Sequence, residues 1–128
     1  MTPELQYLVW SVVLTLVQLI VAILLVVPVA GLPTLAGNRE TMPEIGGAAG
    51  RARRAHANML ENLVLFAGLV LTAHAAGVSN ANTVLGAQLF FWGRVAYAAI
   101  YVVGVPWVRT LAWLVSVAGL VVILLQLF

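Results

Sequence analysis

Four long apolar stretches constrain this chain more than any other feature of its sequence. They cover approximately residues 5–29, 55–76, 83–103 and 108–128. Each approaches or exceeds the roughly 20 residues that an α-helix needs to cross a bilayer. Because 63% of the residues are hydrophobic and only 8% are charged, the chain also lacks the polar surface of an ordinary soluble domain. The sequence therefore predicts an all-α integral membrane protein, in which residues 1–128 form a single domain built as a four-helix bundle.

The arginines predict which side of the membrane each connection faces. Five of the six arginines lie in or beside the first and third connections, namely Arg39, Arg51, Arg53, Arg54 and Arg109. The second connection, residues 77–82, has none. Since positively charged residues are retained on the cytoplasmic side, we expect the first and third connections in the cytoplasm and both termini outside. Without a eukaryotic retention signal in the sequence, we expect a bacterial inner membrane.

The first helix and the connection after it have contrasting patterns. Small and mildly polar residues recur on one side of this helix at spacings of four, three and four, as Ser11, Thr15, Gln18 and Ala22. Such a stripe is typical of a surface that packs against other membrane helices. Residues 31–50 combine glycine, proline and charge, and predict an irregular loop.

A polar run at the start of the second apolar stretch places charge where lipid is expected. At about 100° per residue, four of its side chains fall within about 80° of one helix face: Arg51, Arg54, Asn58 and Glu61. Taken singly, the arginines are equally consistent with a role in fixing topology, and Asn58 is more typical of a hydrogen bond between two helices. Charge inside a membrane is costly and usually functional. The four side chains together therefore favour a binding site for a zwitterionic or anionic ligand.

The third apolar stretch carries a second polar group. Arg94, Tyr97 and Tyr101 share one helix face, and Arg109 follows the next turn. Alone, the tyrosines are more typical of packing. Arg94 is expected about 15 Å inside the cytoplasmic end of its helix, and Glu61 about 10 Å inside the same boundary. Because an unpaired charge at that depth is costly, the sequence predicts a Glu61–Arg94 ion pair, whose loss through either residue would destabilise the protein.

Composition excludes several other kinds of chemistry. The chain has no cysteine and no aspartate, so a thiol reaction would need a thiol supplied by another molecule. His56 and His74 are 18 residues apart, roughly 27 Å on one helix, which excludes a two-histidine metal site within a subunit. We therefore predict no metal. A net charge of +2 is too small for a nucleic-acid-binding patch, and we predict no nucleic-acid partner.

These polar patterns resemble the MAPEG family, the membrane-associated proteins of eicosanoid and glutathione metabolism. The motifs are Arg51-x-x-Arg54-Ala-His56-x-Asn58-x-x-Glu61, similar to the family's second-helix signature, and Arg94-x-x-Tyr97-x-x-x-Tyr101 followed by Arg109, similar to its third-helix pattern. The resemblance covers nearly the whole chain. It implies a homotrimer that binds glutathione between neighbouring subunits, near the cytoplasmic side.

The resemblance also implies a role for each matching residue. Eight side chains would hold glutathione: Arg51, Arg54, Asn58, Glu61, Arg94, Tyr97, Tyr101 and Arg109. We assign the catalytic part to Arg109, Tyr101 and Arg94, with Arg109 stabilising the thiolate, because a nearby guanidinium favours an ionised thiol. Two departures bear on this assignment. Position 57 is alanine, where some eicosanoid-synthesising members have arginine, and the interval from Tyr101 to Arg109 crosses a turn whose length varies in the family.

The implied activity is that of a glutathione transferase, in which bound thiolate attacks a lipophilic electrophile dissolved in membrane lipid. A peroxidase outcome follows when the acceptor is a peroxide. One alternative is a non-catalytic lipid-binding or scaffold protein of the same family. A small multidrug exporter is disfavoured, because such exporters use a carboxylate deep in the first helix and residues 5–29 contain none.

Overall fold

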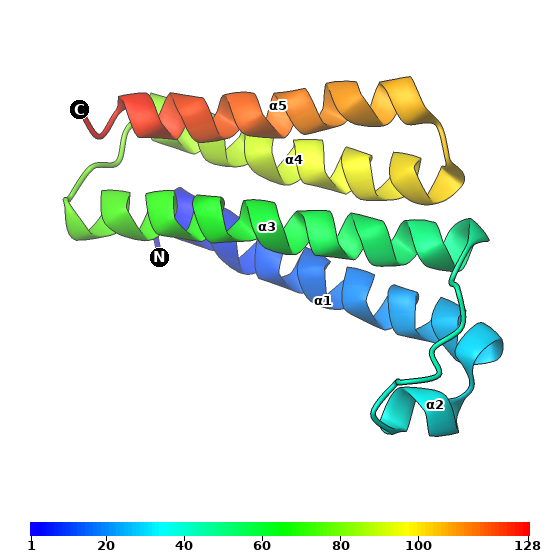
Figure 1. Cartoon of the computed structure of the whole chain (residues 1–128). Helices are drawn as coiled ribbons and strands as arrows, with labels where there is room; N and C mark the ends of the chain where they lie inside the picture. The colour runs from blue at the N-terminus through cyan, green and yellow to red at the C-terminus, as the bar shows by residue number, and fades with distance from the viewer.

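The computed structural model describes residues 1–128, which form five α-helices. These are α1 (Pro3–Ala30), α2 (Leu32–Ala36), α3 (Gly47–Ala75), α4 (Ala81–Val103) and α5 (Pro106–Leu125) (Figure 1). All except α2 are long and apolar enough to cross a membrane, judged by length and composition. The prediction of an all-helical chain with four candidate membrane spans is confirmed.

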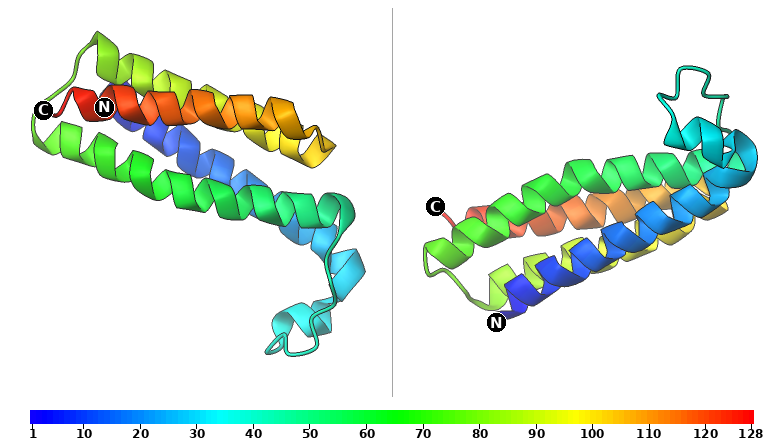
Figure 2. Two further views of the ribbon diagram at one scale, coloured as in Figure 1. Left: turned by 45° about the horizontal axis from the view of Figure 1, so that its top comes forward. Right: turned by 90° about the horizontal axis from the view of Figure 1, so that it is seen from below.

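The four long helices alternate in direction along the bundle. Both chain termini lie at one end, which we call the terminal end (Figure 1). The opposite end, the loop end, holds α2, the start of α3 and the turn between α4 and α5. Within the bundle, α4 packs most extensively on α5, and α1 packs most extensively on α3 (Figure 2). The first and third connections, which carry the arginines, therefore lie together.

Helix boundaries at the loop end differ from the sequence expectation. The connection predicted as irregular contains the short helix α2, and α3 begins at Gly47, well before the apolar stretch starts at residue 55. The arginine run is helical, as the helix face assigned to Arg51, Arg54, Asn58 and Glu61 required. Gly104 ends α4 in the left-handed conformation, with φ of 95°, which favours glycine. Pro106 then begins α5, where its missing N–H has no intrahelical partner to lose.

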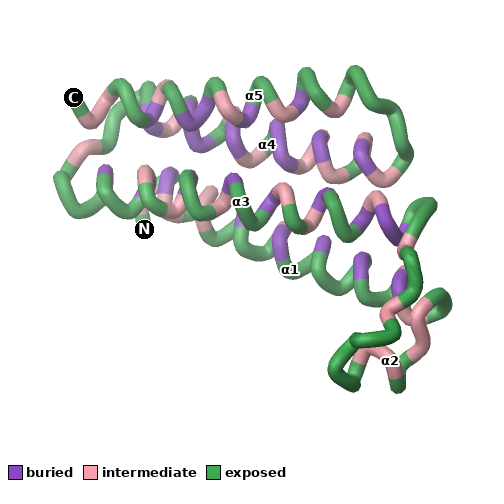
Figure 3. The backbone as a smooth tube through the Cα atoms, viewed as in Figure 1, coloured by how far each residue is buried: buried purple, intermediate pink, exposed green.

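Helix α1 turns its small and polar residues into the bundle and its large apolar residues away from it. The predicted stripe is buried, from Ser11 through Thr15 and Gln18 to Ala22, which confirms that this side packs against other helices. The opposite side exposes large apolar residues such as Leu16 and Ile20. Figure 3 shows buried and exposed residues alternating along α1. Such a surface suits lipid as its surroundings.

Glycines let α4 and α5 approach backbone to backbone. A Cβ atom added to Gly93 would lie 2.9 Å from the backbone nitrogen of Ser116, and one added to Gly119 would lie 2.7 Å from that of Phe90. Small residues at such positions are the usual means of close packing between membrane helices. This contact fixes the start of α5 beside the end of α4.

Glu4 joins three segments at the terminal end, a role that the sequence analysis missed. Its carboxylate is buried, and Oε1 accepts hydrogen bonds from Ser79 Oγ at 2.9 Å and Thr83 Oγ1 at 2.5 Å. Thr83 also belongs to the capping box that Asn80 forms at the start of α4. The carboxylate therefore ties α1 to the connection between α3 and α4.

We expect the variant Glu4→Ala to lower the free energy of unfolding by about 1–3 kcal/mol, because it leaves the buried hydroxyl group of Thr83 without its charged acceptor. Thermal unfolding of the detergent-purified protein, followed by circular dichroism, measures this. Glu44→Ala is the matched control, since Glu44 is exposed in the first connection. Equal unfolding midpoints for the two variants would contradict a structural role for Glu4.

Candidate functional site

Two arginines meet on the ring of Tyr101 at the loop end. Arg54 Nε on α3 donates a hydrogen bond to Tyr101 Oη at 3.1 Å. The guanidinium carbon of Arg109, at the start of α5, lies 4.4 Å from the centre of the same ring. Tyr101 is buried, whereas Arg54 is exposed and Arg109 half-buried. Two positive charges from different helices are therefore held over one aromatic ring.

Arg94 lies deeper between α3 and α4 and is only 1% exposed. Its Nη1 donates a hydrogen bond to Asn58 Oδ1 at 2.8 Å, and its guanidinium carbon lies 4.1 Å from the ring centre of Tyr97. Asn62 Nδ2, one turn along α3, donates to the backbone oxygen of Asn58 at 2.8 Å and to Asn58 Oδ1 at 3.2 Å, and so orients the amide that Arg94 contacts. Arg94 Nε and Nη2 are buried without a hydrogen-bond partner. The buried guanidinium of Arg94 therefore has two nitrogen atoms whose N–H groups have no partner within the chain.

The two tyrosines connect these groups. The ring centres of Tyr97 and Tyr101 are 5.4 Å apart, and the two tyrosines form one buried cluster with Ala55 of α3 and Ala112 of α5. A continuous line of polar side chains thus runs between α3 and α4 toward the loop end. We call it the polar seam, and it comprises Arg54, Asn58, Asn62, Arg94, Tyr97, Tyr101 and Arg109. Six of these seven residues were predicted from the sequence, and Asn62 is the addition.

The predicted Glu61–Arg94 ion pair is wrong for the single chain. Arg94 bonds to Asn58, its remaining nitrogen atoms have no partner, and Glu61 is exposed. The cause is the helical rotation: three residues turn α3 by about 300° and four residues by about 400°. Relative to Asn58, this turns Glu61 outward and Asn62 inward. The carboxylate therefore lies at the edge of the seam and is accessible.

Arg51 makes a backbone contact. Its Nε donates a hydrogen bond to the carbonyl oxygen of Val102 at 3.0 Å, near the C-terminus of α4. A cation is favourable there, because the last carbonyl groups of a helix lack intrahelical partners. Arg51 therefore holds the start of α3 against the end of α4. The ligand contact assigned to it from the sequence stays a prediction.

A single chain encloses the polar seam only partly. A hollow of about 280 Å³ adjoins the outer end of the seam and is lined by Ile45, Gly50, Arg53, Arg54 and Ala57. All of its lining residues come from α3 and the connection before it. One chain thus supplies one side of this hollow, with Arg53 and Arg54 as its charged residues. Arg54 and Glu61 remain exposed at the surface of the chain.

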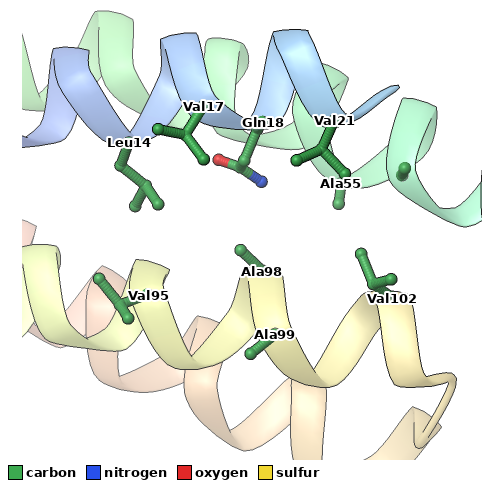
Figure 4. Close-up of a pocket in the computed structure, with 10 residues that line it drawn as sticks. Leu14, Val17, Gln18, Val21, Ala55, Val95, Ala98, Ala99 and Val102 are labelled. Carbon is green, nitrogen blue, oxygen red and sulfur yellow. The ribbon is translucent and has the colours of Figure 1, made fainter. Parts of the chain in front are cut away.

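A separate hollow of about 260 Å³ lies between α1, α3 and α4 (Figure 4). Its lining is apolar except for Gln18 of α1. On α4 it is lined by Val95, Ala98, Ala99 and Val102, which do not belong to the polar seam. No residue predicted for ligand binding lines it.

Comparison with known proteins gave one match. Residues 7–128 match the family model described as the MAPEG family. The match includes every residue of the polar seam, together with Arg51 and Glu61. No curated protein and no solved structure matches the chain.

Proposed function

The chain belongs to the MAPEG family of integral membrane proteins, and on that premise we propose that it is a membrane-bound glutathione transferase. The observation that carries the proposal is the convergence of Arg54 and Arg109 on Tyr101, beside the buried Arg94. A lipophilic electrophile reaches the site from the bilayer. Conjugation is the expected outcome, and peroxide reduction follows when the acceptor is a peroxide.

The chemistry of the polar seam suits glutathione, which carries two carboxylates, an ammonium group and a thiol. Guanidinium groups bind carboxylates through paired hydrogen bonds, and Arg54 and the partnerless donors of Arg94 supply such groups. In this proposal, Asn58 and Tyr97 bind the peptide backbone of glutathione. The exposed Glu61 can take the ammonium group, with Arg51 as a further contact at the loop end.

Thiol activation falls to Arg109 in this proposal. A free thiol has a pKa of about 8.5, and a nearby guanidinium stabilises the thiolate and so lowers that pKa. Tyr101 Oη accepts a hydrogen bond from Arg54, which leaves its own proton free to be donated to sulfur. The thiol proton leaves to water, sulfur bonds to the electrophilic carbon, and the leaving group departs with the bond electrons.

A homotrimer completes the site in this proposal. The seam of one subunit leaves Arg54 and Glu61 exposed, and a neighbouring subunit would cover the bound ligand. We propose that each 128-residue subunit is a single domain. Because the arginines gather at the loop end, that end is assigned to the cytoplasm of a bacterial cell and both termini to the outside of its inner membrane.

The experiment is conjugation of glutathione with 1-chloro-2,4-dinitrobenzene by the detergent-purified protein. We expect Arg109→Ala to reduce the rate at neutral pH by about 10–100-fold, because one to two pKa units of thiolate stabilisation are lost. Raising the pH should restore much of the rate, and the ultraviolet absorbance of the bound thiolate should fall in parallel. His74→Ala, an exposed change at the terminal end, is the control and should keep the wild-type rate.

Two results would count against the proposal. Equal rates and equal thiolate absorbance in wild type and Arg109→Ala would remove Arg109 from the mechanism. Calorimetry that detects no glutathione binding to the wild-type protein would favour a non-catalytic, lipid-binding member of the family.

A further inference from the structure

A groove of about 560 Å³ lies at the loop end between α1, α2 and α3. Its volume is within the range of about 300–1,000 Å³ that is typical of small-molecule sites. Fourteen residues line it, of which 11 are hydrophobic, and the other three are Arg39, Arg53 and His56. The groove uses a different face of α3 from the polar seam, since Arg53 and Arg54 are about 100° apart on the helix.

The two arginines of this groove come from different segments of the loop end. Arg39 follows α2 in a left-handed backbone conformation, and its Nε donates a hydrogen bond to the carbonyl oxygen of Leu35 at 3.0 Å. Its side chain therefore folds back along α2, while Arg53 enters from the first turns of α3. Glu40 and Glu44 are exposed in the same connection and do not line the groove.

Apolar side chains line the rest of the groove. Ile23 of α1, Leu32 of α2 and Leu60 of α3 line it and remain exposed to the surroundings of the chain. A ligand that contacts both the arginines and the apolar side chains would have an anionic group at one end and an apolar chain at the other. Basic pockets between membrane helices near the cytoplasmic surface are suited to anionic lipid headgroups.

We propose that this groove binds one anionic phospholipid. Its phosphate lies between Arg39 and Arg53, where guanidinium groups form strong charge-assisted hydrogen bonds to phosphate oxygen atoms. One acyl chain follows the apolar walls of α1 and α3. The bound lipid braces α2 and the first connection against the bundle. The groove shares Arg53 and Ala57 with the hollow beside the polar seam, but no residue of the polar seam lines it. Lipid binding here does not depend on the thiol chemistry.

The test compares phosphatidylglycerol with phosphatidylcholine as probes. The full chain is reconstituted in nanodiscs that contain both lipids, and the lipids retained after transfer to detergent are identified by native mass spectrometry. We expect wild type to retain phosphatidylglycerol with a preference of about tenfold or more, since each basic residue near the surface contributes about 1 kcal/mol. The double variant Arg39→Gln/Arg53→Gln should lose that preference.

Two further variants separate the groove from its alternatives. The variant Arg39→Gln/Arg53→Gln/Glu40→Gln/Glu44→Gln restores the wild-type net charge, and the preference should stay lost. Ala36→Phe fills the groove from the exposed side of α2 and should reduce phosphatidylglycerol retention about tenfold. Conjugation activity should be unchanged in Ala36→Phe, so failure of this inference is distinct from failure of the proposed function.

Three outcomes would overturn the inference. A preference restored in the quadruple variant would assign lipid selection to net charge. Equal retention in wild type and Ala36→Phe would place the lipid elsewhere on the chain. Absence of retained lipid in wild type, together with a change of oligomeric state in Ala36→Phe, would show that a second copy of this chain fills the groove.

Discussion

Gly119→Val is expected to abolish accumulation of folded protein. A Cβ atom at this position would fall 2.7 Å from the backbone nitrogen of Phe90 and closer still to the carbonyl oxygen of Gly86. Both obstacles are backbone atoms of α4, so relief requires α4 and α5 to separate. Overpacking a core costs about 1–3 kcal/mol or more, and here separation would also move Arg109 away from Tyr101. The yield of monodisperse protein in detergent and the thermal midpoint measure the effect.

Gly68→Ala is the matched control for this prediction. Gly68 is also helical, on α3, but it is exposed and a Cβ atom there meets nothing within 4 Å. Alanine is favoured over glycine in a helix by about 0.5–1 kcal/mol, so this variant should be at least as stable as wild type. If Gly119→Val gave wild-type yield and midpoint, the close α4–α5 contact would be wrong.

Arg94→Met is expected to separate ligand binding from stability. The guanidinium is buried with two partnerless nitrogen atoms, which costs free energy in the absence of a ligand. Replacing a buried charge by an apolar side chain of similar length is often neutral or stabilising. We therefore expect the thermal midpoint of the ligand-free protein to be unchanged or raised. Glutathione affinity should fall by about 100-fold, the equivalent of about 2.7 kcal/mol, because charge-assisted hydrogen bonds to the ligand are lost.

Calorimetric titration with glutathione and thermal unfolding without it are the two measurements. Arg94→Lys is the informative companion, because it keeps the charge but not the planar fork; we expect weakened binding without the gain in stability. A collapse of the ligand-free protein in Arg94→Met would show that the arginine is structural. Unchanged affinity would remove Arg94 from the proposed glutathione site.

The membership of the polar seam was largely predictable from spacing. Arg54 and Asn58 share a face of α3 by helical periodicity, and Tyr97 and Tyr101 share a face of α4 for the same reason. These are local relationships, fixed as soon as the segments are helical. Partner choice is different, because it depends on how α3 and α4 are rotated about their own axes. For that reason Asn58 occupies the place expected for Glu61 beside Arg94.

The partners of Glu4, at the terminal end, were likewise not predictable from spacing within one helix. Its sequence neighbours contain no hint of a partner, and the hydroxyl groups that bind it come from Ser79 and Thr83. Helix α2 and the early start of α3 were missed for another reason. Helix α2 has only five residues, too few to show a helical period, and the first four residues of α3 are glycine and alanine, which give no hydrophobic pattern.

The amino-acid sequence by itself determined the class of the protein, its four membrane-spanning helices, the buried side of α1 and the family to which it belongs. Those properties follow from length, hydropathy and spacing within single segments. Only the tertiary structure decided that Arg51 bonds to the end of α4, that Arg94 meets Asn58, and that Arg39 and Arg53 share a groove. Each of these contacts joins segments whose relative rotation and distance are set by side-chain packing across helices, which periodicity within one helix does not encode.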